Sequence, residues 1–259
     1  MNIGIIGAGN MGGAIARGLA VRPDIATTLI VSSPNRRGEL DALRAEFPTL
    51  STSTANRRVA EQAQCIILAV KPWQLDGVLH EIAPFLREGY HILVSVVAGV
   101  TISHIAEAVN DAATVVRAIP NTGIAVRAGM TFVAGTEASS PAVAEGCRIF
   151  GALGKVMVVT EAQLPAATAL ASCGIAYALR YVRAATEGGV ELGFKAADAQ
   201  AIVAATLQGA AALLQAPGAH AEAEIDRVTT PGGITIKGLN AMENAGFTAA
   251  VIAGLKASV

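Results

Sequence analysis

The sequence is poor in cysteine and lacks the cysteine spacings of a metal site or a redox pair. Its three cysteines, Cys65, Cys147 and Cys173, are odd in number and far apart. There is no CxxC pair and no Cys/His cluster, so we predict no metal site and no disulfide framework. The first residues already have the pattern of a β-strand, so we expect no signal peptide. A reduced, cytoplasmic compartment fits this composition.

An excess of charge of one sign is also missing. Lys and Arg number 19 against 20 Asp and Glu, and no basic stripe stands out, which disfavours a nucleic-acid partner. The longest apolar stretch, residues 92–102, is about half the length that a membrane-spanning helix needs. We therefore expect no membrane span. The hydrophobic content of 53% is high, and burial between the subunits of a homodimer or higher homo-oligomer explains it best.

The first part of the chain alternates strand-like and helix-compatible segments. Strand-like runs are Met1–Gly7, Thr28–Val31, Cys65–Val70, His91–Val97, Thr114–Ile119, Met130–Ala134 and Val156–Val159. Helix-compatible stretches are Met11–Ala20, Asn35–Phe47, Leu75–Arg87, Ile102–Asn110 and Pro141–Leu153. This alternation predicts βαβ units and a mostly parallel sheet.

The pattern changes near Thr160, where strand-like runs stop. Ala, Leu and Glu then recur at helical spacing through Gln163–Gly188, Ala196–Gln215 and Ile234–Ala245. We therefore predict an α/β fold of two domains, with a Rossmann-type dinucleotide-binding domain over 1–160 and an all-α domain over 161–259. The second domain is small and very apolar, so we expect it to need a partner chain to bury its helices.

The segment Gly7–Gly12 has the pattern GxGxxG and lies between the first strand and the first helix. In this context Gly7 permits a tight turn, Gly9 lets the backbone approach a pyrophosphate, and Gly12 lets the helix pack on the strand. The helix dipole then faces the phosphates. The alternative is an ordinary strand-to-helix turn. We predict a nicotinamide dinucleotide site.

The end of the second strand indicates which cofactor binds. Enzymes specific for NAD tend to place an acid here to bind the ribose 2′-hydroxyl, but no acid precedes Glu39. Ser32 and Ser33, followed by Arg36 and Arg37, suit a 2′-phosphate. We predict that NADP(H) is preferred and NAD(H) possible. The alternative is that both arginines are solvated residues that open a helix.

A second glycine-rich segment, Thr229–Thr235, precedes the last predicted helix. We predict that Thr230 is the N-cap of this helix and Pro231 its first residue. The N–H groups exposed by Gly232 and Gly233, together with the helix dipole, would then bind a carboxylate. A plain capped helix start is the alternative.

These motifs resemble those of the pyrroline-5-carboxylate reductase family. The most specific match is the Pro-Gly-Gly-Ile-Thr loop followed by Lys237-Gly238-Leu239. The other matches, which extend over nearly the whole chain, are Gly7–Met11, Ala69–Pro72, Ala98–Ile102 and Pro120–Thr122. The resemblance implies NAD(P)H-dependent reduction of 1-pyrroline-5-carboxylate to L-proline, the last step of proline biosynthesis. It implies a dimerisation domain at the C-terminus.

The resemblance also implies roles for individual residues. Thr235 would be the catalytic residue, hydrogen-bonded to the ring nitrogen. Thr230, Gly232, Gly233, Ile234 and Thr235 would bind the substrate. The cofactor residues would be Ile6, Gly7, Ala8, Gly9, Asn10, Met11, Gly12, Ser32, Ser33, Arg36, Asn56, Ala69, Val70, Lys71, Pro72, Ala98 and Asn121. The four histidines, His80, His91, His104 and His220, are interpreted as surface residues rather than catalysts, and Cys173 as a structural residue.

Two segments depart from the family pattern. Residues 171–177 read Ala-Ser-Cys-Gly-Ile-Ala-Tyr instead of Ser-Gly-Ser-Gly-Pro-Ala-Tyr, and Gly123 replaces a common proline. Two other functions stay open. A 3-hydroxy acid dehydrogenase would need a lysine early in the helical domain, but none occurs between Lys155 and Lys195. A non-catalytic NADP-binding regulator would have no reason to keep the Thr235 loop.

Overall fold

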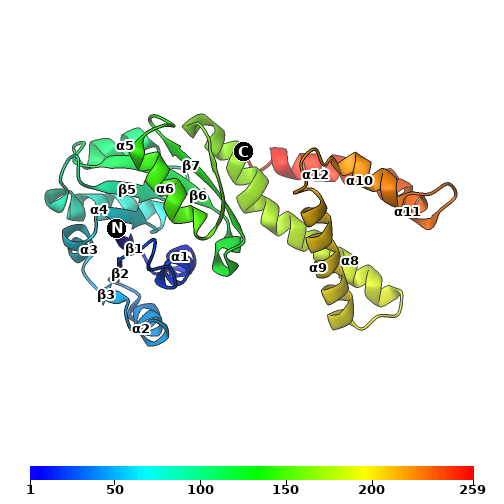
Figure 1. Cartoon of the computed structure of the whole chain (residues 1–259), viewed down its shortest axis with the longest axis horizontal. Helices are drawn as coiled ribbons and strands as arrows, with labels where there is room; N and C mark the ends of the chain where they lie inside the picture. Colours follow the sequence, from blue (N-terminus) through cyan, green and yellow to red (C-terminus); the bar gives the residue numbers. More distant parts are fainter. The chain divides into compact units, whose positions relative to one another are not determined.

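The computed structural model describes residues 1–259 and divides into two compact units (Figure 1). The first unit comprises Met1–Ser172 and the second Cys173–Val259. The first is the predicted α/β unit and the second is helical throughout.

The first unit is built on one sheet of eight strands in the order β3-β2-β1-β4-β5-β6-β7-β8. The strands are β1 (Asn2–Ile6), β2 (Thr28–Ser32), β3 (Ser51–Ser53), β4 (Cys65–Leu68), β5 (Ile92–Ser95), β6 (Thr114–Pro120), β7 (Gly129–Gly135) and β8 (Gly154–Val158). Only β6 and β7 pair antiparallel, which confirms the mostly parallel sheet. The strand order reverses direction at β1 and β4, which is where such sheets bind ligands.

Helices cover both faces of this sheet (Figure 1). One face packs against α1 (Asn10–Ala20), α2 (Arg37–Glu46) and α6 (Pro141–Gly151). The other packs against α3 (Asn56–Gln62), α4 (Pro72–Ile82) and α5 (Ile102–Ala108). Because both faces are buried, the central strands are continuous apolar runs such as Cys-Ile-Ile-Leu in β4.

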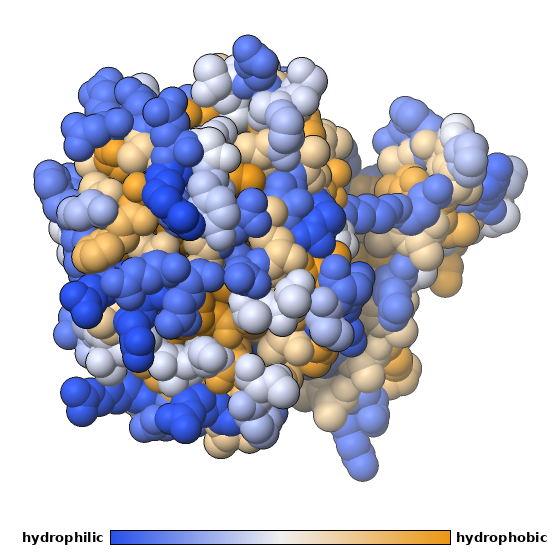
Figure 2. All heavy atoms as spheres, turned by 60° about the vertical axis from the view of Figure 1, so that its left-hand side comes forward, coloured by the Kyte–Doolittle hydropathy of each residue, from blue (hydrophilic) through white to orange (hydrophobic).

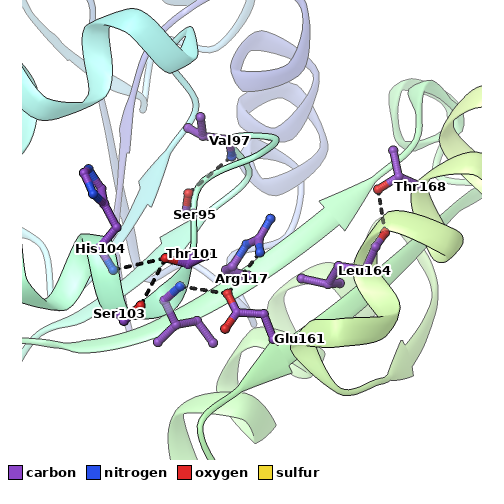
Figure 3. Close-up of polar contacts among 10 residues, drawn as sticks. Ser95, Val97, Thr101, Ser103, His104, Arg117, Glu161, Leu164 and Thr168 are labelled. Atoms are coloured by element: carbon purple, nitrogen blue, oxygen red, sulfur yellow. Dashed lines mark hydrogen bonds and ion pairs between the residues drawn. The ribbon is translucent and has the colours of Figure 1, made fainter. Parts of the chain in front are cut away.

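The first unit continues past Thr160. Leu164 and Ala167 pack with Phe132 in a small apolar cluster on the sheet. Glu161 contacts the same unit through polar bonds: its Oε1 accepts from Nη1 of Arg117 at 3.0 Å and from the backbone N–H of Ile102 at 2.7 Å. Figure 3 shows these contacts joining β6, the start of α5 and the segment that leads to the helical unit.

The second unit consists of α8 (Gly174–Glu191), α9 (Ala196–Leu213), α10 (Ala221–Val228), α11 (Ile234–Asn244) and α12 (Phe247–Lys256). Ala199 is its only buried apolar residue. Large apolar side chains are exposed instead, among them Leu192 at 83% and Ile234 at 87%. Figure 2 shows orange and tan surface among blue side chains on the helical unit. Because only Ala199 is buried, this unit has no adequate core of its own.

One helical segment is long and apolar enough to cross a membrane. Residues 161–191 meet this criterion by length and composition, with 17% of the window buried. The search for the longest unbroken apolar stretch did not find this segment, because polar residues interrupt the apolar residues of 161–191. A single such segment is weak grounds for a membrane span, since an interface helix has the same composition.

His91 is buried, so its interpretation as a surface residue was wrong. Its Nδ1 accepts from the backbone N–H of Arg87 at 2.8 Å and its Nε2 lies 3.0 Å from the carbonyl oxygen of Ala60. The residue is 2% exposed. Burial lowers the pKa of His91 below its usual 6.5, against the opposing effect of the Ala60 carbonyl. The imidazole is therefore a neutral structural group.

This burial predicts a pH dependence of stability. The unfolded chain takes up a proton at His91 near pH 6.5, whereas the folded chain does so only at lower pH. The His91 contribution to stability is thus present above pH 6.5 and is lost as the pH falls through the lowered folded pKa. Denaturant unfolding as a function of pH should show a shallower decline for His91→Gln. His220→Gln, at an exposed position, serves as the control; equal profiles for the wild type and His91→Gln would contradict the assignment.

Candidate active site

A pocket of about 1180 Å³ lies at the carboxyl ends of β1, β4 and β5 in the first unit. It brings together residues from six separate segments of the chain. Of the residues predicted to contact a cofactor, it is lined by Ile6, Gly7, Ala8, Gly9, Asn10, Met11, Ser33, Arg36, Asn56, Ala69, Val70, Lys71, Pro72 and Ala98. Gly12, Ser32 and Asn121 are not in its lining.

Glycine is required at each of the three positions of the turn for a different structural reason. Gly7 has φ +109°, and a Cβ there would lie 2.4 Å from the carbonyl oxygen of Ala69. A Cβ at Gly12 would lie 1.9 Å from the carbonyl oxygen of Gly7, so this residue packs the helix on the strand. A Cβ at Gly9 meets no protein atom within 4 Å. Gly9 therefore leaves open space next to the backbone, which fits a pyrophosphate that approaches closely.

A buried chain of hydrogen bonds supports the pocket beside β2. Ser32 donates its hydroxyl to Oδ1 of Asn56 at 2.9 Å, and Nδ2 of Asn56 donates to Oε2 of Glu81 at 2.7 Å. Ser32 is fully buried and Asn56 is 3% exposed. Ser32 thus orients Asn56 at the pocket wall rather than facing the pocket itself.

The structure separates the two arginines that follow β2. Arg36 lines the pocket and donates to Oε1 of Glu39 at 2.8 Å, and both side chains are about half exposed. Arg37 does not line this pocket. The pKa of the Glu39 carboxyl is lowered, first by a hydrogen bond from the backbone N–H of Glu39 and then by the hydrogen bond from Arg36. An exposed ion pair of this kind contributes little to stability, so little free energy is lost when Arg36 leaves Glu39.

Sequence reasoning missed several lining residues on α4 and after β6. These are Trp73, Gln74, Gly77, Val78 and Glu81 from α4, and Thr122, Ile124 and Ala125 after β6, besides Ala14, Pro34, Asn35, Glu39, Val96 and Val97. Trp73, the only tryptophan of the chain, is 80% exposed. Its position directly after Lys71 and Pro72 was the signal in the sequence that could have placed it in the pocket lining. Lys71 itself caps α4, where its N–H donates to Gln74.

Asn121 organises the chain beside the pocket. Its Oδ1 accepts from the N–H groups of Gly123 at 3.1 Å and Met130 at 3.3 Å, and its Nδ2 donates to the carbonyl of Ala171 at 3.4 Å. A proline at 123 would lack the N–H that makes the first of these bonds. Ser172 donates to the carbonyl of Pro120 at 3.1 Å. Both departures from the family pattern therefore fall on one hydrogen-bonded cluster at the end of β6.

The loop Thr230–Gly233 lies in the second unit and is a turn rather than the first turn of a helix. The N–H of Gly233 donates to the carbonyl of Thr230 at 2.9 Å, and Gly232 has φ +72°. These features are typical of a type II turn with proline second and glycine third. Helix α11 begins at Ile234 with Gly233 as N-cap, so the prediction of Thr230 as N-cap and Pro231 as first residue was wrong.

Thr235 stands in the first turn of α11. Its side chain is exposed and its hydroxyl makes no hydrogen bond within the chain. The helix has no side-chain cap at its N-terminus, so its first N–H groups are available to a ligand. Backbone N–H groups, a helix dipole and a free hydroxyl therefore meet at one place, which is suited to a small carboxylate.

The cysteines show no reactive environment. Cys65 is fully buried, and burial raises the pKa of its thiol to about 12. Burial also raises the pKa of the Cys147 thiol. All three cysteines are free. No group of three or more His, Cys, Asp or Glu side chains is placed to hold a metal ion.

Comparison with known proteins matches both units. Residues 161–259 match the family described as pyrroline-5-carboxylate reductase dimerisation, and residues 2–99 match that described as NADP oxidoreductase, coenzyme F420-dependent. Pyrroline-5-carboxylate reductase 1 of Dictyostelium discoideum is 39% identical over 99% of this chain, which spans about half, 48%, of that protein. Pyrroline-5-carboxylate reductase of Synechocystis is 34% identical over 100% of this chain and 96% of its own.

A solved structure extends the likeness to three dimensions. Pyrroline carboxylate reductase of Plasmodium falciparum with NADP bound has a TM-score of 0.86 and 25% identity, over 100% of this chain and 95% of that chain. The Synechocystis and Plasmodium proteins both match this chain across its two units, and the chain covers nearly the whole length of each. The glycine turn, the Pro-Gly-Gly-Ile-Thr loop and full-length similarity thus agree, and the chain belongs to the pyrroline-5-carboxylate reductase family.

Proposed function

We propose that the protein reduces 1-pyrroline-5-carboxylate to L-proline with a reduced nicotinamide cofactor, the last step of proline biosynthesis. The observation that carries this proposal is the pairing, in one chain, of a dinucleotide pocket with the specific Pro-Gly-Gly-Ile-Thr loop. Relatives that match the chain over almost its whole length have this activity in their names, which favours neither a hydroxy acid dehydrogenase nor a regulator.

The residues of the pocket hold the cofactor in this proposal. The N–H groups of the Gly7–Met11 turn receive the pyrophosphate, where Gly9 leaves room for it. Ala69–Pro72 and Ala98 line the side toward the nicotinamide, and Asn56, Ser33 and Arg36 receive the adenosine ribose. When bound, the cofactor supplies the hydride.

The residues of the second unit hold the substrate. The N–H groups of Gly232 and Ile234 bind the carboxylate. Thr230 and Gly233 hold the turn in shape through the bond from the Gly233 N–H to the Thr230 carbonyl. The hydroxyl of Thr235 hydrogen-bonds the ring nitrogen and orients the imine carbon. A protonated imine is already an electrophile, so orientation contributes several kcal/mol of the barrier reduction without a separate acid. We propose residues 161–259 as the substrate-binding and dimerisation domain and 1–160 as the cofactor domain.

The decisive measurement is the oxidation of NADPH with pyrroline-5-carboxylate as the substrate. Proline should form in equal amount to the NADPH consumed. A lack of turnover while NADP⁺ still binds would leave the chain a dinucleotide-binding protein without this activity.

We propose NADP(H) as the preferred cofactor, with NAD(H) as a poorer alternative. The support is the absence of an acid directly after β2 and the presence of Ser33 and Arg36 in the pocket lining. The family description of residues 2–99 and the NADP in the Plasmodium relative agree with this preference.

Arg36→Ala should raise KM for NADPH about tenfold and leave KM for NADH nearly unchanged, because only NADPH has the 2′-phosphate and one charge-assisted bond is worth about 1.5 kcal/mol or more. Steady-state kinetics with both cofactors measure this. Arg37→Ala is the matched control, since Arg37 lies outside the pocket lining. Equal increases in KM for both cofactors would show that Arg36 does not bind the phosphate.

We further propose that the protein is a cytoplasmic homodimer or larger homo-oligomer whose helical units form the interface. The support is the lack of a core in Cys173–Val259 and its match to a dimerisation family. The apolar segment 161–191 then faces protein rather than lipid. Three free cysteines agree with a reducing compartment.

Sedimentation at micromolar concentration should therefore show a mass of at least twice 26.2 kDa. Ile252→Asp adds a charge on α12, where Ile252 is 52% exposed, and should weaken association if that helix is in the interface. Thr54→Asp, on the first unit, is the control for the added charge. A monomer in the wild type would refute the assembly.

A further inference from the structure

A second pocket lies in the first unit next to the cofactor pocket. It is formed by α2, β3 and the start of α3 and has a volume of about 630 Å³. Its lining consists of Arg37, Leu40, Asp41, Arg44, Thr52, Ser53, Thr54, Ala55, Arg57 and Arg58. None of these residues lines the larger pocket, so the two are separate sites.

Positive charge exceeds negative charge in this pocket. Four guanidinium groups face one carboxylate, that of Asp41. Arg37, Arg44 and Arg58 have no acidic partner, and Arg57 is 4.0 Å from Glu61. Other arginines of the unit do have close partners: Arg17 lies 2.7 Å from Glu46 and Arg22 lies 2.6 Å from Asp24. Like charges gathered in one concave surface repel each other, and a bound anion removes that cost.

The uncharged lining suits the same kind of ligand. Ser53 uses its hydroxyl within the loop, where it accepts from the N–H of Ala55 at 3.0 Å. The hydroxyls of Thr52 and Thr54 make no hydrogen bond within the chain and remain as donors. Guanidinium groups bind phosphate oxygens with two parallel bonds, and hydroxyls complete the shell.

We propose that this pocket binds a compact anion with two linked phosphate groups, either free pyrophosphate or the phosphate chain of a nucleotide, together with the cofactor. Residues that line this pocket are sequence neighbours of residues that line the cofactor pocket. Arg37 follows Arg36, and Ala55 and Arg57 flank Asn56. An anion bound here therefore contacts the same two segments that carry the ribose-binding residues. The site does not depend on the reaction that the enzyme catalyses.

Calorimetric titration of pyrophosphate into the full-length protein saturated with NADP⁺ tests the proposal. We expect one site per chain, with an affinity that falls as NaCl is raised, because the contacts are ionic. Arg44→Gln/Arg58→Gln should weaken binding at least about tenfold, the effect of losing one or more charge-assisted bonds. Arg180→Gln/Lys256→Gln removes two positive charges from the other unit and should leave the affinity unchanged.

A second titration with ATP distinguishes the two sources: tighter binding of ATP identifies a nucleotide, and tighter binding of pyrophosphate identifies the free anion. Three results would overturn the proposal. They are no binding to the NADP⁺-saturated protein, binding that NADP⁺ abolishes, and binding that Arg44→Gln/Arg58→Gln does not weaken. Circular dichroism of that variant shows whether it is folded. Because the readout is binding, the result is independent of reductase activity.

Discussion

Replacement of Thr235 by valine is expected to lower kcat about 30- to 1000-fold, which corresponds to the loss of one transition-state hydrogen bond of about 2–4 kcal/mol. Valine keeps the branched shape of threonine and has a similar helix propensity, so α11 should form as before. The Thr235 hydroxyl makes no bond within the chain, so its removal leaves no protein group unsatisfied. The effect should therefore appear in catalysis and not in stability.

The split between the kinetic constants tests this role. The carboxylate of the substrate would still be bound by backbone N–H groups, so KM for pyrroline-5-carboxylate should change less than kcat. KM for NADPH should not change. Thr235→Ser retains the hydroxyl and is expected to recover most of the rate. Wild-type kcat in the valine variant would exclude Thr235 from the chemistry and leave the loop an anion site.

Replacement of Glu161 by alanine is expected to reduce the free energy of unfolding by about 2 kcal/mol, less than for a fully buried ion pair because the Glu161 side chain is 33% exposed. The Arg117 side chain is 9% exposed, and its Nε already has no hydrogen-bond partner. Without Glu161 its charge would be buried without a counter-ion. The variant also loses the acceptor for the first N–H of α5, at Ile102.

Chemical denaturation at one fixed protein concentration measures this loss, because association also contributes to the stability of an oligomer. Glu187→Ala is the matched control: it breaks the exposed pair with Arg183 and should cost about 0.5 kcal/mol or less. In Arg117→Met/Glu161→Ala the buried charge is gone, so much of the stability should return. An equal loss in Glu161→Ala and Glu187→Ala would mean that the Arg117 pair is no stronger than a surface pair.

Elements with a clear apolar pattern were predictable from the sequence, and several others were not. The apolar runs of β1, β4 and β5 and the spacing in α1 and α6 indicate buried elements directly. The sequence patterns missed β3, α3, α10 and α12. Strand β3 has only three residues, all of them polar, and sits at the sheet edge beside β2. An edge strand of that length carries no hydrophobic pattern to detect.

The same difference applies to the site. The sequence by itself determined where the glycine turn, the Pro-Gly-Gly-Ile-Thr loop and the polar residues after β2 lie, because turn residues are recognised from their neighbours along the chain. It did not give the conformation of the Pro-Gly-Gly-Ile-Thr loop, which is a turn rather than a helix start. Only the tertiary structure decided that Arg36 and Arg37 face different pockets, that Ser32 acts through Asn56, and that Glu161 holds Arg117. Each of these depends on strand order, register or helix packing between segments far apart in sequence, and local residue patterns carry no information about such contacts.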